Sequence, residues 1–570
     1  MSSLKISARV SILALAAAAS TTLPLRAGAE PAGAYLAARQ ARMANDYDAA
    51  AHYYLRALGN DPREARLLDG LVLSQVSAGN VSGAVSAAER LEEMGVDSQV
   101  GHMALIADEV MRQDYAAVLT RLDGQRGIGP LVDGLLSAWV LLGQGDMGAA
   151  LARFDSVGQE PGLARFARYH KALALSYVGD FEGAEALYAA DGDRPIQMTR
   201  RAVLARAEVL SQLDHNQDAL TLLDSVFGSD PGSEVQQMRD RLAAGETLPN
   251  THVTSVQDGV AEVFYTIAAA LETETAGAYT LLYSRIATTL RPDHVDAILL
   301  TGKLLEDLDR SELATQAYRA VPREDPNFYL AELGRATALR KAGREDAALE
   351  VLDQLASDFP DVAKVQASRG DHYRWQGKYL EAVKSYDKAL SLYGADDPAK
   401  WFVYYARGMS RERLDNWPEA KADFRAALAL NPDQPRLLNY LGYSMVEKRE
   451  DLDEALAMIQ KAAQIDQSSG YIVDSLGWAY FQLGRYDEAV TEMERAAELT
   501  PVDPVITDHL GDAYWKVGRQ REARFQWTRA LSFNPEEKEA TRIRRKLQAG
   551  LDAVLAEEQK GIETVASDGG

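Results

Sequence analysis

The chain has 570 residues, more than a single hydrophobic core usually supports, so it must form several domains or a repeat solenoid. Its 47% hydrophobic and 8% aromatic residues exclude a disordered chain, and its net charge of -23 argues against a nucleic-acid partner, which needs clustered Lys and Arg. The chain has no cysteine, which excludes disulfides, thiolate metal sites, a cysteine nucleophile and a lipidated cysteine.

Residues 1–29 have the features of an export signal. Lys5 and Arg9 precede an apolar run over 10–19, and Ala27-Gly28-Ala29 supplies the small residues that a signal peptidase requires. We expect cleavage before Glu30. The alternative, an N-terminal membrane anchor, is disfavoured because the run is shorter than the roughly 20 residues that span a bilayer. No other segment has such an apolar length, so we expect a soluble mature protein without a transmembrane segment.

Helix-turn-helix units are predicted over 30–231. An alanine recurs in the second helix of each unit, and a glycine or another residue that tolerates a left-handed backbone recurs at the turn before it. The alanines are Ala50, Ala84, Ala150, Ala184 and Ala219. These units lack a fixed Leu-Gly-x-x-Tyr core, so we interpret them as degenerate repeats.

Residues 232–258 interrupt the pattern. The segment contains the helix breakers Gly245 and Pro249 and a Thr/Ser-rich run over 251–255. We therefore predict a linker here, and the boundary between two domains.

A second array is predicted over 259–535, with marker alanines Ala314, Ala348, Ala382, Ala420 and Ala455. Its last two units repeat one pattern at a spacing of 34 residues: Leu476, Gly477, Tyr480, Gly484, Ala489, Ala496 and Pro501 correspond to Leu510, Gly511, Tyr514, Gly518, Ala523, Ala530 and Pro535. Further turn positions are Gly79, Gly145, Gly179, Gly343, Gly377, Asn45, Asp214, Asp309 and Asp415. The whole chain holds about 14 units.

This pattern resembles the tetratricopeptide repeat (TPR), whose period and Leu-Gly-x-x-Tyr…Ala…Pro signature it reproduces. The resemblance implies an all-α solenoid of helical hairpins that winds as a right-handed superhelix. Residues 536–570 follow the last repeat. There we predict a charged capping helix from about Glu536 to Gln559 and a disordered tail over 565–570, because a terminal repeat needs a polar outer surface.

No stretch matches the sequence patterns of common enzymes, such as a phosphate-binding Gly-rich loop, a nucleophile elbow or a zinc-binding His-Glu-x-x-His helix. The eight histidines are scattered. The pair Asp508 and His509 is interpreted as a solvent-exposed helix position, and acid pairs such as Asp487-Glu488 as favourable charges at helix starts. The sequence therefore predicts a binding protein, not an enzyme, with no cofactor and no metal.

The TPR resemblance places positions two, five, nine and twelve of each first helix on the concave face. In the last four repeats, the candidate partner-binding residues at these positions are Tyr405, Met409, Asn439, Tyr443, Asp474, Trp478, Phe481, Asp508, Asp512 and Trp515. Aromatic residues are enriched at binding hot spots. Packing between repeats is the alternative. For Tyr405, Tyr443 and Phe481, packing between repeats and partner binding are equally good interpretations. For Trp478 and Trp515, partner binding is favoured.

A basic cluster lies near the C-terminus and comprises Arg519, Arg521, Arg524, Arg529, Arg542, Arg544, Arg545 and Lys546. Half of it belongs to the predicted capping helix, so we interpret it as a solvated charged face. Weak docking on an anionic membrane surface or an acidic partner is the alternative.

Residues 435–535 are similar to a group of large exported bacterial TPR proteins that includes the lipoprotein adaptor of a periplasmic carboxy-terminal processing protease. The similarity rests on Leu438 to Tyr443, Asp474 to Trp478, His509 to Asp512, Glu522 to Arg524, and Trp527. It implies a non-enzymatic periplasmic scaffold whose partners are other proteins, such as a protease and its substrates. The absence of cysteine departs from the lipidated adaptors. The alternative function is binding of peptidoglycan or polysaccharide by the same aromatic residues.

Overall fold

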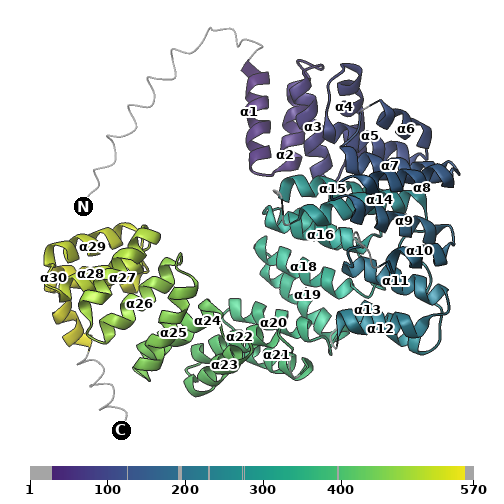
Figure 1. Cartoon of the computed structure of the whole chain (residues 1–570). Helices are drawn as coiled ribbons and strands as arrows, with labels where there is room; N and C mark the ends of the chain where they lie inside the picture. The colour runs from purple at the N-terminus through teal and green to yellow at the C-terminus, as the bar shows by residue number, and fades with distance from the viewer. Residues whose placement is uncertain are drawn as a thin grey trace, which may run out of the picture. The chain divides into compact units, whose positions relative to one another are not determined.

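Figure 1 shows the computed structural model, which describes residues 29–124, 126–190, 196–228, 232–272, 274, 277–394 and 397–558. In these ranges every regular element is a helix, which confirms the predicted all-α repeat fold. The predicted signal, apart from Ala29, and the C-terminal tail lie outside the described residues.

The helices fall into two compact units, one ending at Leu355 and the other beginning at Ala356. Unit 1 contains α1 (Ala29–Met43), α2 (Tyr47–Leu58), α3 (Ala65–Ala78), α4 (Val81–Glu93), α5 (Gln99–Met111), α6 (Tyr115–Asp123), α7 (Pro130–Gly143), α8 (Met147–Gln159), α9 (Ala164–Tyr177), α10 (Phe181–Tyr188), α11 (Arg200–Gln212), α12 (Asn216–Phe227), α13 (Gly232–Ala243), α14 (Val256–Leu271), α15 (Gly277–Leu290), α16 (Val295–Asp307), α17 (Ser311–Tyr318) and α18 (Phe328–Lys341). Helix α19 (Glu345–Asp358) crosses the boundary.

Unit 2 contains α20 (Ala363–Trp375), α21 (Tyr379–Leu392), α22 (Lys400–Arg413), α23 (Trp417–Leu430), α24 (Pro435–Glu447), α25 (Leu452–Ile465), α26 (Gly470–Gln482), α27 (Tyr486–Leu499), α28 (Pro504–Lys516), α29 (Gln520–Ser532) and α30 (Glu537–Ala549). Taken in chain order as successive pairs, with α13 and α30 left single, the described helices agree with a count of about 14 repeats. We call the first helix of each pair its A-helix.

The turns within the hairpins have the predicted left-handed backbone. Gly484 and Gly518 have φ angles of +74° and +82°, and the predicted turn residues Asn45 and Asp415 have +55° and +58°. Glycine adopts this conformation without a Cβ penalty, and Asn and Asp tolerate it better than most residues. The turn prediction is therefore confirmed at these positions. Asp487 and Glu488 lie in the first turn of α27, as predicted.

Close packing within a hairpin depends on the small residue of its A-helix. A Cβ atom added to Gly477 would lie 2.6 Å from Cγ of Met493 and 3.3 Å from the carbonyl oxygen of Ala489. Gly511 is the equivalent of Gly477 in the next repeat, and it packs against the ring of Trp527. The predicted contact between Gly477 and Ala489 therefore exists, and it fixes the approach of the two helices.

The predicted boundary at 232–258 differs from the division that the structure shows, because this segment lies inside unit 1. The Gln212 side chain donates a hydrogen bond to the carbonyl of Leu248, and the Asn250 side chain donates one to the carbonyl of Ser176. The Ser211 hydroxyl accepts from the backbone N–H of Leu248. Helices earlier in the chain thus satisfy the polar groups of the segment, which holds it against them.

The segment delivers the chain to α14 and α15, which pack back on the beginning of unit 1 (Figure 1). Helix α14 packs against α7 and α9, and α15 packs against α3, α4 and α5. At one such contact a Cβ on Gly259 would lie 2.3 Å from the ring of Trp139, which is itself fully buried. The A-helices α3, α5, α7 and α9 are thus packed against a later part of the same chain.

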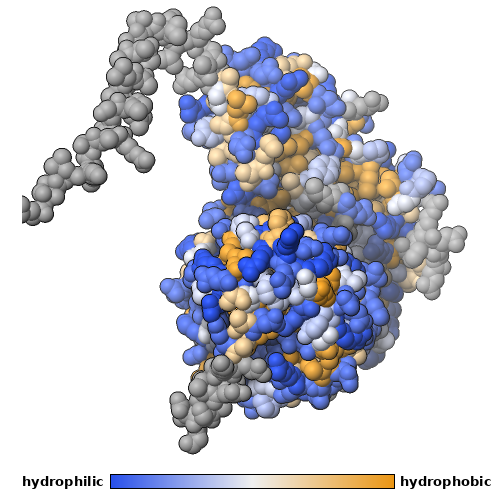
Figure 2. Space-filling view, turned by 90° about the vertical axis from the view of Figure 1, so that its left-hand side faces the viewer, coloured by the Kyte–Doolittle hydropathy of each residue, from blue (hydrophilic) through white to orange (hydrophobic). Residues whose placement is uncertain are grey.

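The C-terminal cap covers the predicted range but is interrupted at Gly550. Helix α30 ends at Ala549, because Gly550 has a φ of +84°, and a further helical stretch covers 551–558. A Cβ on Gly550 would lie 2.5 Å from the ring of Trp515, so the break also brings the chain close to that ring. The end of unit 2 that carries α30 faces the viewer in Figure 2 and is mainly hydrophilic, with small scattered hydrophobic patches.

Candidate interaction surface and buried polar clusters

The predicted partner-binding residues of α22 pack partly within unit 2. Tyr405 lies edge-on to Tyr440, with ring centroids 5.6 Å apart, and its ring centroid is 6.1 Å from that of Phe424. Met409 is partly buried against the same core. Phe402, at the start of the helix, remains 43% exposed. The surface on α22 is therefore provided by Phe402 more than by Tyr405.

Trp478 lies at the centre of the predicted surface but is only 8% exposed. Its ring stacks on Phe481 and on His509, at centroid distances of 5.0 and 4.2 Å. Its indole N–H donates to Glu447 at 2.6 Å, which joins α26 to α24. Tyr443 on α24 is partly buried. Burial is the main reason that its pKa is raised, and the charges of Glu447 and Asp474 raise it further. Trp478 and Phe481 thus contribute mainly to packing between repeats.

His509 is buried, so its interpretation as a solvent-exposed position is wrong. Its Nδ1 lies 2.8 Å from Oδ2 of Asp474, which is 35 residues earlier in the chain. Burial lowers the pKa of His509, but the carboxylates of Asp474, Asp508 and Asp512 more than offset this and raise the pKa above its usual value. An ion pair between two repeats explains the position.

Asp508 and Asp512 are also buried, and they bind a lysine of the cap. The ammonium group of Lys546 is fully buried and lies 2.9 and 2.8 Å from the two oxygens of Asp508 and 2.7 Å from Oδ2 of Asp512. The indole N–H of Trp527 donates to the other oxygen of Asp512 at 2.9 Å. Burial and the neighbouring Asp512 raise the pKa of Asp508. These two acids hold α30 in place.

Trp515 is partly buried at the same end of unit 2. Its indole N–H donates to Asp552 at 2.9 Å, and the chain at Gly550 closes over its ring. Trp515 is therefore bound by residues that follow α30. Its role in partner binding, like that of the other candidate residues, stays a prediction.

Two acceptor atoms among the candidate residues have no hydrogen-bond partner. Oδ1 of Asn439 on α24 and Oδ1 of Asp474 on α26 are both buried and unpaired. Buried polar groups are hydrogen-bonded in the large majority of cases, so each exception calls for an explanation.

The basic cluster is largely paired with acids of the same chain. Arg519 lies 3.0 Å from Glu494 and 3.2 Å from Glu522, and Arg542 lies 2.8 Å from Glu558. The remaining pairs are Arg544 with Glu537, Arg545 with Glu557, and Lys546 with Asp508 and Asp512. Arg524 and Arg529 donate to backbone carbonyls. Most of these arginines are exposed, in agreement with the predicted solvated charged face, but Lys546 is fully buried, so the prediction is wrong for that residue.

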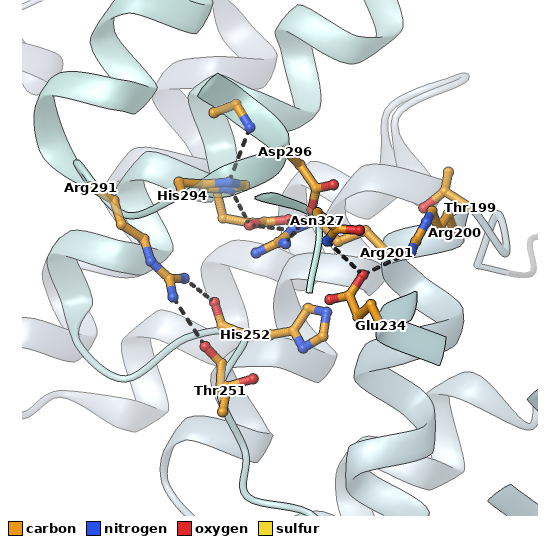
Figure 3. Close-up of polar contacts among 12 residues, drawn as sticks. Thr199, Arg200, Arg201, Glu234, Thr251, His252, Arg291, His294, Asp296 and Asn327 are labelled. Atoms are coloured by element: carbon orange, nitrogen blue, oxygen red, sulfur yellow. Dashed lines mark hydrogen bonds and ion pairs between the residues drawn. The ribbon is translucent and has the colours of Figure 1, made fainter. Parts of the chain in front are cut away.

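Unit 1 contains a buried ionic cluster that sequence analysis did not find (Figure 3). Nε of Arg201 on α11 lies 2.8 and 2.9 Å from the two oxygens of Glu262 on α14, and its Nη1 lies 2.7 Å from Asp296 on α16. Glu262 has no exposed surface and is also bound by the hydroxyl of Tyr169 at 2.8 Å and by His294 at 3.1 Å. The cluster ties four helices together.

The charges of this cluster stabilise one another. Burial alone would raise the pKa of Glu262, but Arg201 and His294 hold it well below its usual value. The pKa of His294 is lowered, by burial and by the charge of Arg201, so this imidazole is held neutral. Nearby, His170 accepts a hydrogen bond from the Trp139 indole at 3.2 Å, and complete burial lowers its pKa to about 4. We interpret the cluster as structural and not as a site of proton transfer, because its central carboxylate, Glu262, has no exposed surface.

The loop before α14 is held by a second set of polar contacts. Glu208 accepts hydrogen bonds from the backbone N–H and hydroxyl of Thr251 and lies 2.8 Å from Nδ1 of His252. Arg291 donates to the carbonyls of His252 and Thr251, as Figure 3 shows. No local sequence signal predicts these contacts, because the partners are about 40 residues apart.

Within the described part of the chain, no group of His, Asp and Glu side chains is arranged to hold a metal ion. No helix there is both long and apolar enough to cross a membrane.

Comparison with known proteins identifies the repeats. Family models described as "Tetratricopeptide repeat" match residues 35–95, 333–399 and 405–470, and one described as "TPR repeat" matches 477–518. The chain is similar to a TPR repeat-containing protein of Pseudomonas aeruginosa, with 30% identity over 189 residues, which are 32% of this chain and 30% of that protein.

Two other curated relatives match shorter segments. A lipoprotein NlpI homolog of Haemophilus influenzae is 33% identical over 85 residues, covering 15% of this chain and 26% of its own length. The mitochondrial import receptor subunit TOM70 of Mus musculus is 25% identical over 139 residues, covering 24% of this chain and 22% of its own length. The chain spans less than a third of each of these relatives.

Among solved structures, the Cut9 and Hcn1 hetero-tetramer of the APC/C aligns over 91% of this chain and 96% of the matched chain, at 15% identity and a TM-score of 0.39.

Proposed function

We propose that this tetratricopeptide-repeat protein is an exported, non-enzymatic scaffold that binds other proteins through the A-helices of unit 2. The observation that carries the proposal is that three A-helices each have an exposed apolar side chain near their start. Phe402, Tyr471 and Val505 are 43%, 61% and 38% exposed and lie on α22, α26 and α28. Exposed aromatic residues on a preformed helical surface supply contact area at low entropic cost.

Unit 2 is favoured over unit 1 because the A-helices differ in what covers them. In unit 1, α3, α5, α7 and α9 are packed against α14 or α15 of the same chain. A partner would have to displace these helices, and with them the ion pair between Arg201 and Glu262. No such displacement is needed at Phe402 or Tyr471.

We further propose that the protein acts in the periplasm and that a processing protease and its substrates are among its partners. The support is the signal-like sequence of residues 1–29, the similarity of residues 435–535 to protease adaptors, and the relatives of Pseudomonas and Haemophilus. Fractionation with N-terminal sequencing tests the first point: we expect the mature chain to begin at Glu30 in the periplasmic fraction, and an intact Met1 in the cytoplasm would refute it.

Binding of peptidoglycan or polysaccharide is less well supported. This function would use Tyr443, Trp478 and Trp515 as sugar-stacking platforms, but the ring of Trp478 already stacks on Phe481 and His509. Trp515 is covered by the chain around Gly550.

The test is a cross-linking pull-down with full-length protein, read by mass spectrometry. The double variant Phe402→Ala and Tyr471→Ala should lose the specific partners, while the helical content and melting temperature stay close to those of the unchanged protein. Phe525→Ala is the matched control, because Phe525 is 66% exposed but lies on α29, the second helix of its hairpin. Equal recovery by the double variant and the control would contradict the proposed surface.

A further inference from the structure

Four successive A-helices of unit 2 have an exposed side chain at the same position of the repeat, within their first turn. These residues are Phe402 on α22, Arg436 on α24, Tyr471 on α26 and Val505 on α28, at spacings of 34, 35 and 34 residues. Three of them are apolar. Arg436 alone among the four carries a charge.

Contacts between aromatic rings place Arg436 close to Phe402. On α22 the ring centroids of Phe402 and Tyr405 are 6.5 Å apart, and Tyr405 lies edge-on to Tyr440 of α24 at 5.6 Å. Arg436 precedes Tyr440 by four residues, so both side chains lie on one face of α24. Successive A-helices run in the same direction, because a complete hairpin separates them. Arg436 and Phe402 therefore lie on the same side of the contact between the two tyrosines.

The charge of Arg436 has no partner of opposite charge within the described residues, where its exposed side chain makes no hydrogen bond and no ion pair. It acts on the neighbouring tyrosine. Burial raises the pKa of Tyr405, and the charges of Arg374 and Arg436 oppose this effect. The Tyr405 hydroxyl therefore stays protonated at neutral pH and can donate a hydrogen bond beside the guanidinium.

Acidic side chains on the same A-helices differ from Arg436, because groups of the same chain already bind them. Glu412 on α22 accepts a hydrogen bond from the Tyr440 hydroxyl at 2.7 Å. In the later repeats, Glu447 accepts from the Trp478 indole, Asp474 pairs with His509, and Asp508 and Asp512 bind Lys546. A partner that approaches these helices thus meets an exposed guanidinium and acids that are already bound.

We infer that Arg436 binds the carboxylate of an aspartate or glutamate in a partner polypeptide, and that Phe402 contacts an apolar residue next to that acid. The inference rests on the proposed scaffold function and adds to it the chemistry of the partner segment. Guanidinium groups suit this role, because their planar N–H donors match the two oxygens of a carboxylate.

The carboxylate belongs to a side chain and not to a chain end. Phe402 and Tyr471 lie on the A-helices before and after α24, so the bound segment continues past Arg436 in both directions. The net charge of -23 repels acidic segments from the protein as a whole. Binding therefore favours segments whose acid reaches Arg436 over segments that are acidic throughout.

The probe is a library of random twelve-residue peptides displayed on phage and selected on the immobilised full-length protein. The displayed peptides are fused through their C-termini, so the carboxylates that they offer belong to side chains. We expect the enriched sequences to carry Asp or Glu directly beside an apolar residue. With Arg436→Gln their enrichment should fall about tenfold or more, and with Arg436→Glu the enriched sequences should carry Lys or Arg in place of the acid.

The most enriched sequence is then synthesised with a fluorescein label and an amidated C-terminus, and its binding is measured by fluorescence anisotropy. Replacing its acid with the corresponding amide should weaken binding about tenfold at low salt, and this difference should shrink as salt is added. A free C-terminal carboxylate in the amide peptide should not restore binding. Arg521→Gln is the matched control, because Arg521 is also exposed but lies on α29, the second helix of its hairpin.

Arg436→Gln should leave the helical content and the melting temperature unchanged, because the side chain is exposed. Enriched sequences without an acid, or equal peptide affinity of the Arg436→Gln and Arg521→Gln proteins, would overturn the inference.

The two proposals fail separately. Loss of natural partners in the double variant of Phe402 and Tyr471, with full recovery by Arg436→Gln, would leave the scaffold standing without its acid-binding site. Acid-selective peptide binding at Arg436 without any recovered natural partner would do the reverse.

Discussion

Units 1 and 2 are built from the same helical hairpin but differ in what covers their A-helices. In unit 1 the later helices α14 and α15 lie on α3, α5, α7 and α9, and a buried ionic cluster around Glu262 links α14 to α9 and α11. In unit 2 the starts of α22, α26 and α28 keep apolar side chains exposed. A repeat array thus provides a binding surface only where its own chain does not occupy it.

The largest effect should come from breaking the ionic cluster that fastens α14. Glu262→Ala would leave Arg201 buried without its main partner, and loss of one member of a buried pair costs roughly 3 to 5 kcal/mol. Hydrogen exchange should show loosening of unit 1 and unchanged protection in unit 2. Glu454→Ala is the control, because its pair with Arg425 is about half exposed and such pairs contribute little. Uniform loosening of both units would refute their independence.

A comparison of two aromatic residues on α26 separates packing from binding. Trp478→Ala removes a ring that is 8% exposed, so we expect a loss of about 3 kcal/mol or more in the free energy of unfolding of unit 2. Tyr471→Ala removes a ring that is 61% exposed and should change stability by less than about 0.5 kcal/mol while weakening partner recovery. Denaturant unfolding and pull-down on the same preparations measure both. A stable Trp478→Ala protein that lost its partner would place the binding site at Trp478.

The two units should respond to pH in opposite directions near neutrality. In unit 1 the folded-state pKa of His170, about 4, lies below its unfolded value of about 6.5, so protonation favours unfolding as pH falls through this window. The shift corresponds to about 3 kcal/mol. Trp139, Tyr169 and the charge of Glu262 surround this imidazole.

In unit 2 the pKa of His509 is raised in the folded state. Its contribution to stability is fully present below the unfolded pKa of about 6.5 and is lost as pH rises through the folded pKa. Hydrogen exchange resolved by unit, between about pH 5.5 and 8, measures both effects. His509→Gln should remove the dependence of unit 2 without changing that of unit 1. The same slope in both units would contradict the assignment.

The smallest of these effects concerns packing inside one hairpin. Ala489→Leu would overpack the contact between Gly477 and the second helix, at a cost of roughly 1 to 3 kcal/mol. Because the hairpins of unit 2 contact their neighbours in sequence, melting should begin in unit 2 while unit 1 stays folded. Thr491→Leu, at an exposed position of the same helix, is the control. Equal effects of the two changes would argue against the close approach at Gly477.

The features that could be predicted correctly from the sequence are those that depend on residues close by in the chain. Gly484 adopts a left-handed turn because its own backbone requires it, and Gly477 is small because its own hairpin is tight. His509 was misplaced at the surface because its partner Asp474 belongs to another repeat. Nothing local to Glu262 or Arg201 indicates that they meet, since 61 residues separate them.

The return of α14 and α15 onto the first helices has a consequence for the order of folding. The side chain of Arg285 donates to the carbonyl of Ser77, 208 residues earlier, and Asn45 donates to the carbonyl of Leu308, 263 residues later. Contacts this distant in sequence form slowly, because a long loop must close before they stabilise the chain. The apolar sides of α3, α5 and α7 therefore stay uncovered until α15, which ends at Leu290, is available. In unit 2 each hairpin contacts its neighbours in sequence, so its apolar surface is covered as soon as the next hairpin has formed.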